Sequence, residues 1–270
     1  MPSTVPVPKD LRLWNIGLSA VHAIFAVIAA IPPDVSLPVY SSPVQPYGGN
    51  GTWGVTPGGT ASETSLSLKW MVFSFFAITS FAHAAYGFVF RSEYEANIRE
   101  CRNPLRWIEY AGSASVMAVS IAYFCTVIWR HTLFAILGLV MTTMGYGHVT
   151  EMVSRPKDGD EWTLPLSVRI VPHLIGYIPL VVAFWIIGSQ FGYAASLSSP
   201  EGRQMPSFVY YIVGTQFFGF FSFGFIQLAA LVASPKQFGN FERLYCVLSA
   251  VVKVILGLII FVQVLFRSSA

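Results

Sequence analysis

Charged residues are scarce in this chain. Only 11% of its 270 residues are Asp, Glu, Lys or Arg, against about 25% in an average soluble domain. Apolar residues make up 54%, and the few charges cluster between long neutral runs. This composition excludes a soluble enzyme with a large core and indicates a polytopic helical membrane protein. The net charge of +3 is modest, and we expect no nucleic-acid partner.

Cysteine is scarce as well. The chain has three, Cys101, Cys125 and Cys246, without a CxxC pair or a Cys/His spacing typical of metal ligands. We therefore expect neither a disulfide framework nor a metal site, and no enzymatic activity.

Long hydrophobic runs, in contrast, are abundant. Because roughly 20 apolar residues cross the hydrocarbon of a bilayer, each run of about 18 or more is a candidate span. Seven occur, near 11–31, 65–90, 104–128, 132–153, 165–189, 207–233 and 242–266. They predict an all-α, seven-helix membrane protein, with residues 1–270 forming a single domain in the cell membrane. The first run resembles a secretory signal, but no clear cleavage site follows it, so an uncleaved span is favoured.

The basic residues indicate the orientation of these spans. With a cytoplasmic N-terminus, 11 of the 16 Lys and Arg residues lie in inside segments and 4 in outside segments, while Lys253 lies within a span. This bias follows the positive-inside rule and predicts a cytoplasmic N-terminus and an extracellular C-terminus.

One long connection, at about 32–64, is then extracellular. Its Pro, Gly, Ser and Thr residues favour turns and short extended pieces over helix. Asn50-Gly51-Thr52 matches the N-glycosylation acceptor, which agrees with an exterior location. The mixed-charge connections 91–104 and 154–161 are interpreted as solvated cytoplasmic segments, and Glu151 as an interfacial residue.

Lys253, near the middle of the last run, is the first functional candidate. An ionised amine at that depth costs several kcal/mol unless it is paired or chemically modified. Lysine is also the side chain that forms Schiff bases. Glu109, about five residues into the third helix, is its expected partner, and Ser249 shares the lysine face one turn earlier. Two interpretations stay open: a structural ion pair, or a protonated Schiff base with Glu109 as counterion.

Other polar and aromatic residues of the predicted spans are further candidates for the site around this pair. Ser113 lies one turn after Glu109, and His22 and His83 occupy otherwise apolar turns of the first two spans. We assign no role to His131, His148 and His173. The sixth span is rich in phenylalanine, and half of these rings are expected to face lipid while the others wall a flat, conjugated ligand. They are Phe217, Phe218, Phe220, Phe221, Phe223 and Phe225.

Taken together, these features resemble the heliorhodopsin family, whose members are inverted-topology microbial rhodopsins. The shared features are a lysine on the seventh helix, an Arg-x-x-acid pair on the third and an inside N-terminus. His22 and His83 fall where the family has its first- and second-helix histidines. The matching segments are Arg106-Trp107-Ile108-Glu109-Tyr110 with Ser113, Ser115, Val116 and Met117; Pro156-Lys157-Asp158-Gly159-Asp160; Leu248-Ser249-x-Val251-x-Lys253; and Phe223 to Gln227.

The resemblance implies all-trans retinal bound to Lys253 as a Schiff base, with Glu109 as sole primary counterion and Ser249 beside it. It implies a cytoplasmic polar cavity at His22 and His83, and a homodimer. The expected retinal-binding residues are Lys253, Glu109, Ser249, Tyr110, Ser113, Met117, Phe220 and Phe223. Phe25 and Phe221 stand where polar residues are common in the family. The pocket residues of the fifth helix are not assigned.

Three functions follow as alternatives. Most members of the family are regarded as light sensors with slow photocycles and no pumping, and we expect the same here, with an unknown signalling partner. A light-gated ion channel is the second hypothesis, with Glu109, His22 and His83 on the ion pathway. A retinal-free scaffold held by the ion pair is the third. Proton pumping is not expected, because the third helix carries no second carboxylate beyond Glu109.

Overall fold

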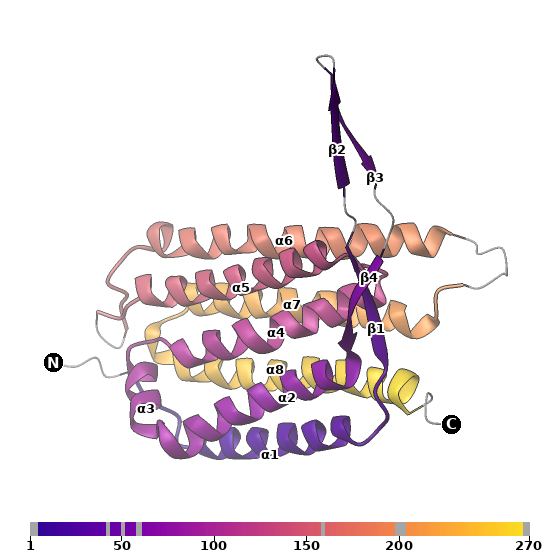
Figure 1. Ribbon diagram of the computed structural model, residues 1–270. Helices are drawn as coiled ribbons and strands as arrows, with labels where there is room; N and C mark the ends of the chain where they lie inside the picture. Colours follow the sequence, from indigo (N-terminus) through magenta and orange to yellow (C-terminus); the bar gives the residue numbers. More distant parts are fainter. Residues whose placement is uncertain are drawn as a thin grey trace.

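In the part of the chain that the structure describes, seven long helices form one bundle, and Figure 1 shows them lying side by side. A computed structural model describes residues 5–41, 44–49, 52–57, 61–157, 160–197 and 204–266. The helices are α1 (Leu11–Ala30), α2 (Leu68–Ala84), α4 (Pro104–Phe124), α5 (Arg130–Val153), α6 (Leu166–Ser196), α7 (Ser207–Val232) and α8 (Phe238–Ile260). The π-helical turns η1 (Ala85–Val89) and η3 (Phe261–Leu265) continue α2 and α8, and the 3-10 turn η2 (Pro235–Gln237) precedes α8. Each predicted run coincides with one long helix.

Helix α4 is more polar than its neighbours. In the part of the chain that the structure describes, six helices are long and apolar enough to cross a membrane, and α4 is not among them. It has 21 residues but carries Arg106, Glu109, Ser113, Ser115 and Ser120, all buried. Because α4 packs against α2, α5 and α7, these side chains face protein rather than lipid, which makes a polar seventh span tolerable.

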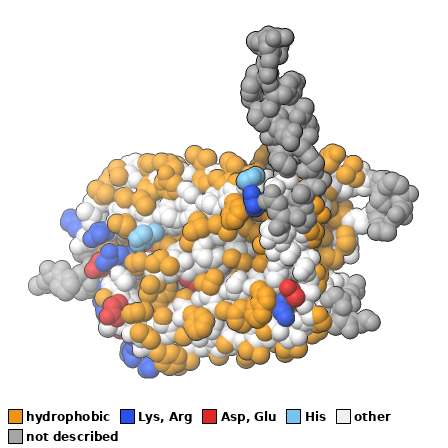
Figure 2. Space-filling model, in the orientation of Figure 1, with side chains coloured by type: hydrophobic (Ala, Val, Ile, Leu, Met, Phe, Trp, Pro, Cys, Tyr) orange, Lys and Arg blue, Asp and Glu red, His pale blue; other side chains and the backbone are white. Residues whose placement is uncertain are grey.

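The flanks of the bundle are apolar and its ends are charged. Figure 2 shows hydrophobic side chains covering the side of the bundle, with charged side chains gathered mainly at the end where α3 (Arg91–Arg99) lies. Exposed rings on the flanks include Phe81, Trp185 and Phe218. Phe218 and Phe225 of the aromatic helix α7 point outward, whereas Phe220 is only 5% exposed. Such a belt of exposed apolar side chains fits a lipid environment.

The long connection after α1 contains short strands, in agreement with the extended pieces expected there, so the all-α description applies to the bundle alone. Strand β1 (Ser36–Ser41) pairs antiparallel with β4 (Ala61–Ser67), and β2 (Val44–Gly49) pairs antiparallel with β3 (Thr52–Pro57). The backbone N–H of Tyr40, on β1, donates to the carbonyl of Ile128 at 3.0 Å, which ties the β1–β4 sheet to the α4–α5 connection. Proline and glycine interrupt the side-chain alternation that would reveal strands in the sequence. Asn50 and Gly51 of the glycosylation motif lie outside the described residues.

The mixed-charge connection after α2 also contains unexpected order. Residues Arg91–Arg99 form α3, which buries Tyr94 and Ile98, one turn apart, beneath the bundle end. Arg91 and Arg99, at the two ends of this helix, stay exposed. The interpretation of a solvated segment overlooked this short amphipathic pattern of two apolar residues at an i, i+4 spacing.

Candidate functional site

The site is built around Lys253 of α8. Its Nζ donates hydrogen bonds to Glu109 Oε1 at 3.1 Å and to Ser249 Oγ at 2.8 Å. Lys253 is 3% exposed and Glu109 5% exposed, so the ion pair is withdrawn from solvent. The bond to Ser249 shows that the lysine stem runs back one turn toward the start of α8, as helical side chains tend to do. This direction lets a residue deep in α8 reach a carboxylate near the start of α4.

Glu109 is held by three donors on the same oxygen. Ser113 Oγ donates to Oε1 at 2.6 Å, and the Thr79 hydroxyl of α2 donates to the same atom, in addition to Lys253. Thr79 was missing from the residues predicted by sequence. It lies one turn before His83 on the same face of α2, and this spacing was the available signal.

A cavity with mainly apolar walls begins at the lysine amine. It is lined by Tyr110, Ala114, Met117, Met144, Phe220, Phe223, Ser249, Val252 and Lys253. Met144, Phe220 and Phe223 also line a second cavity between α4, α5, α6 and α7, so the two cavities adjoin. Together they form a mainly apolar path that begins at Lys253.

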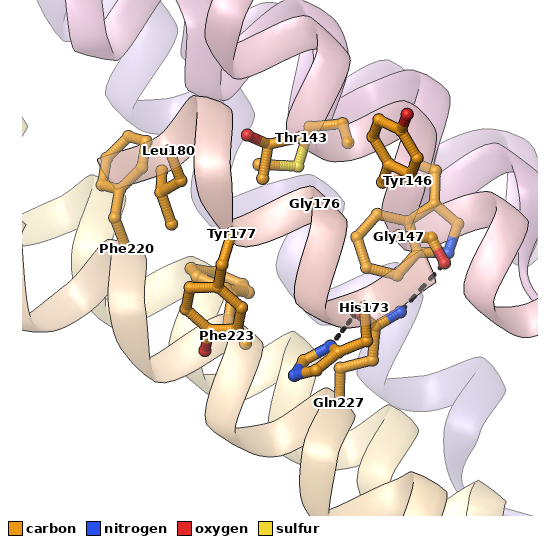
Figure 3. A pocket seen from close by; sticks show the side chains of 13 residues that line it. Thr143, Tyr146, Gly147, His173, Gly176, Tyr177, Leu180, Phe220, Phe223 and Gln227 are labelled. Atoms are coloured by element: carbon orange, nitrogen blue, oxygen red, sulfur yellow. Dashed lines mark hydrogen bonds between the residues drawn. The ribbon is translucent and has the colours of Figure 1, made fainter. Parts of the chain in front are cut away.

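The second cavity provides the wall from α6 that could not be assigned by sequence. His173, Gly176, Tyr177 and Leu180 line it from that helix (Figure 3). His173 Nδ1 lies 2.9 Å from Gln227 Oε1, and Gln227 Nε2 donates to the Gly147 carbonyl at 2.9 Å. His173, given no role above, therefore joins α6 to α7 and, through Gln227, to α5.

His22 and His83 lie next to one another. Their rings stack with centroids 5.8 Å apart. His83 Nδ1 is 2.7 Å from Asn15 Oδ1, and His22 Nδ1 is 2.7 Å from the Leu18 carbonyl. Among the described residues, the buried Nε2 of His22 has no hydrogen-bond partner. Phe25 stacks on Phe76 and makes one wall of this region apolar.

His83 and Glu109 share a small inner pocket. Its lining continues to Asn15, Tyr86 and Arg106, so the histidine region and the carboxylate adjoin through this pocket. The structure thus brings all four predicted polar residues, Lys253, Glu109, His22 and His83, into one region of the bundle.

Arg106 lies beneath this pocket in a buried charge cluster. Its guanidinium bonds to the carboxylates of Glu151 and Glu242, and the Tyr245 ring centroid lies 3.9 Å from its central carbon. The Asn103 backbone N–H donates to Glu151 at 2.8 Å, and the Asn103 amide donates to Glu242 at 2.7 Å.

The interpretation of Glu151 as an interfacial residue is therefore wrong. Its side chain is 5% exposed overall and faces Arg106 instead of the surface. The buried position of Glu242 was not predicted, because this residue stands at the very start of the last predicted run. A run boundary in the sequence does not say which neighbouring helix the side chain meets.

The carboxylates of the long helices all lie on one side of the lysine amine. Glu109, Glu151 and Glu242 are the Asp or Glu residues of these helices within the described ranges. Each lies at or near the end of its helix that faces α3. Between Lys253 and the opposite end of the bundle, the long helices carry none. The arrangement can hold a positive charge at the lysine, with the carboxylates of the long helices on one side only.

Comparisons with known proteins agree with this architecture. The family model for heliorhodopsins matches residues 11–265. A comparison with curated protein sequences found no match. Among solved structures, the crystal structure of cyanorhodopsin from the cyanobacterium Tolypothrix sp. NIES-4075 is similar, with a TM-score of 0.57. The similarity covers 96% of this chain and 95% of that one at 9% sequence identity, so it shows the microbial rhodopsin fold alone.

Proposed function

Because the chain belongs to the heliorhodopsin family, whose members are non-enzymatic retinal-binding photoreceptors, we propose that it is a light sensor that does not pump ions. All-trans retinal is bound to Lys253 as a protonated Schiff base, and Glu109 is the counterion of that Schiff base. The observation that carries this proposal is the buried Lys253–Glu109 pair at the end of an apolar path. Family membership sets aside the retinal-free scaffold, and the chain is a multi-pass membrane protein.

The residues present fit this cofactor. Retinal has one carbonyl group and an otherwise apolar body, and the path offers one primary amine at the end of mainly apolar walls. Lys253 would attach it, while Tyr110, Met117, Phe220 and Phe223 would hold the polyene. When bound, retinal supplies absorption of visible light and isomerisation of its double bonds.

Glu109 keeps a positive charge at the lysine nitrogen favourable. A carboxylate about 3 Å from a cation in a low-dielectric site favours the protonated form of that cation. The hydroxyls of Thr79 and Ser113 fix the carboxylate by donating to the oxygen that faces Lys253. Ser249 accepts a hydrogen bond from the lysine nitrogen and orients it.

The one-sided placement of carboxylates supports a sensor over a pump. A pump needs proton acceptors and donors on both sides of the moving proton. Among the described residues, the groups near Glu109 that could accept a proton are His22, His83 and Glu242, all on the same side of the lysine. A proton released within the bundle stays in that region, which favours a long-lived photoproduct and a slow photocycle.

Chromophore attachment can be tested directly. After addition of all-trans retinal, borohydride reduction and peptide mapping are expected to find the label on Lys253, and extraction from the dark-adapted pigment is expected to return the all-trans isomer. The Lys253→Ala variant serves as the control and is expected to form no visible absorption band. A label on another residue would overturn the proposal.

A light-gated channel is the competing function, favoured by the row of polar side chains along one inner pocket, formed by Asn15, His83 and Glu109. Whole-cell voltage clamp under illumination separates the two functions. We expect no photocurrent in symmetric buffer at any holding potential. A voltage-dependent current that disappears in Lys253→Ala would establish the channel instead.

We further propose that residues 1–270 form one domain and that two copies assemble as a homodimer, as the family resemblance suggests. The connection at about 32–64 would lie on the extracellular side and cover part of the partner. Light scattering of the detergent-solubilised protein is expected to give the mass of two chains, and a monomer mass would contradict the assembly.

A further inference from the structure

A polar cavity at the α3 end of the bundle is separate from the retinal site. It has a volume of about 260 Å³, far more than the roughly 10–15 Å³ that one water requires. The segment before α1 forms one wall, and η1 and α3 form the other. Its charged lining residues are Lys9, Arg12, Arg91, Arg99 and Glu95. We name it the basic pocket.

The charges of the basic pocket do not balance. Among the described residues that line this pocket, Glu95 is the single carboxylate, and Arg91 bonds to it at 2.9 Å while Arg99 lies 3.8 Å from it. Arg12 Nε donates to the Gly87 carbonyl at 3.4 Å, which positions the guanidinium without neutralising it. Lys9 has no ion-pair partner among the described residues. Four cations therefore surround the cavity with one anion between them.

Neighbouring acidic residues do not supply the missing charge. Asp10, next to Lys9, is paired with Arg243, and that guanidinium lowers the pKa of the Asp10 carboxyl. Glu93, on α3, accepts a hydrogen bond from Ser92 and is absent from the lining. Like charges around a shared cavity attract counter-ions, and arginines in particular recognise the geometry of phosphate.

The floor of the basic pocket is aromatic and ordered. Tyr86 and Tyr94 both line it, are each 4% exposed, and stack with ring centroids 4.9 Å apart. Tyr86 belongs to the π-helical turn η1, and such turns occur frequently at functional sites. This floor gives the cavity a defined shape, unlike a group of surface lysines on a flat face.

Tyr86 also belongs to the inner pocket of the photoreceptor site. It lines that pocket together with His83 and Glu109, and its ring meets the edge of the His83 ring at 6.0 Å. Its buried hydroxyl has no hydrogen-bond partner among the described residues. One aromatic ring therefore separates the basic pocket from the histidine region.

We propose that the basic pocket binds a phosphate group, and that its occupancy is communicated to His83 through Tyr86. Two sources share this chemistry: the headgroup of an anionic phospholipid at the membrane surface, and a soluble phosphate compound. The binding half of the proposal does not depend on retinal, whereas the communication half rests on the proposed function.

Binding is tested in nanodiscs with the full chain, with and without added retinal. One arm adds radiolabelled pyrophosphate to phosphatidylcholine discs, and the other includes phosphatidic acid and detects retained lipid by native mass spectrometry. The Lys9→Gln/Arg12→Gln variant is expected to bind about tenfold more weakly for each cation removed. Both side chains are exposed, so the variant is expected to keep the wild-type melting temperature.

The matched control is Lys157→Gln/Lys236→Gln, which removes two charges from other connections at the same end. Weaker probe binding in the Lys9→Gln/Arg12→Gln variant alone supports phosphate binding by the basic pocket, and the probe that shows this effect identifies the source of the phosphate. Equal weakening in both variants, or no binding of either probe to the wild type, overturns phosphate binding by this pocket. If the probe binds but the protein forms no visible absorption band after retinal is added, the photoreceptor proposal is refuted while the phosphate site stands.

Communication is tested by flash photolysis. The probe that binds is expected to change the lifetime of the photoproduct in the wild type, and this change is expected to be lost in the pocket variant and in Tyr86→Leu. A lifetime that saturating probe leaves unchanged in the wild type would overturn the communication through Tyr86.

Discussion

Glu109 shows how much one buried oxygen can depend on its neighbours. Three donors from α2, α4 and α8 meet at its Oε1. Helical spacing predicted the contribution of Ser113, and the charge pattern predicted that of Lys253. Thr79 was not predicted: its spacing from His83 places it on the same face of α2, but a threonine in an apolar helix does not by itself show that this face meets Glu109.

Removal of the Glu109 charge tests its role as counterion. The Glu109→Gln variant is expected to shift the absorption band to longer wavelength, or to lose the visible band through deprotonation, because the anion that favours the cation is gone. Absorption spectra recorded against pH measure this. Glu100→Gln, an exposed carboxylate paired with Arg102, is the control and is expected to leave the spectrum unchanged. An unchanged spectrum in Glu109→Gln would exclude it as counterion.

Arg106 is a second residue whose partners only the fold reveals. The Arg106→Gln variant would leave two buried carboxylates, Glu151 and Glu242, without their cation, and breaking a buried pair in this way costs about 3–5 kcal/mol. We therefore expect a clearly lower melting temperature in detergent. Arg102→Gln, which breaks a partly exposed pair with Glu100, is expected to change stability by about 1 kcal/mol or less. Equal effects of the two variants would contradict the buried cluster.

At the scale of elements, the long helices were predictable and the short elements were not. Apolar length and composition are local properties, so the predicted runs coincide with α1, α2, α4, α5, α6, α7 and α8. Strand β1 depends on β4 at the far end of the connection, β2 and β3 are neighbours whose side-chain alternation is interrupted by proline and glycine, and α3 depends on one buried turn. Tyr40, for example, is held by the carbonyl of Ile128 beyond α4.

Helix α5 approaches α4 through a glycine. A Cβ placed on Gly147 would overlap the buried ring of Trp107, whereas a Cβ on Gly145 would meet nothing within 4 Å. We expect Gly147→Ala to lower stability by about 1–3 kcal/mol through overpacking, and Gly145→Ala to be neutral or stabilising by up to about 1 kcal/mol through helix propensity. Thermal unfolding of the two variants measures this, and similar melting temperatures would contradict the close α4–α5 contact.

At the scale of the whole molecule, an odd number of spans places the start of α1 and the end of α8 on opposite sides of the membrane. The basic residues concentrate at the α3 end, in the connections that the positive-inside rule assigns to the cytoplasm. The basic pocket lies at this same end, next to the cytoplasmic leaflet in the proposed orientation.

Orientation can be measured by cysteine labelling in intact cells. We expect an impermeant maleimide to label Ser65→Cys, exposed on β4, and to label Ser92→Cys, exposed on α3, only after the membrane is permeabilised. The native cysteines are buried, and burial raises the pKa of the Cys101 thiol to about 12, so the unsubstituted chain is expected to react little. The reverse labelling pattern would contradict a cytoplasmic N-terminus.

The sequence alone determined the class of protein, the positions of the long helices and the candidacy of Lys253 and Glu109. These follow from length, hydropathy and the energetic penalty of charge in lipid, all of which can be evaluated along the chain. Only the tertiary structure decided that Arg106 meets Glu151 and Glu242, that α6 walls the second cavity and that Tyr86 separates two pockets. Each of these is a contact between helices far apart in sequence, and helix rotation about its own axis sets such contacts without leaving a local pattern.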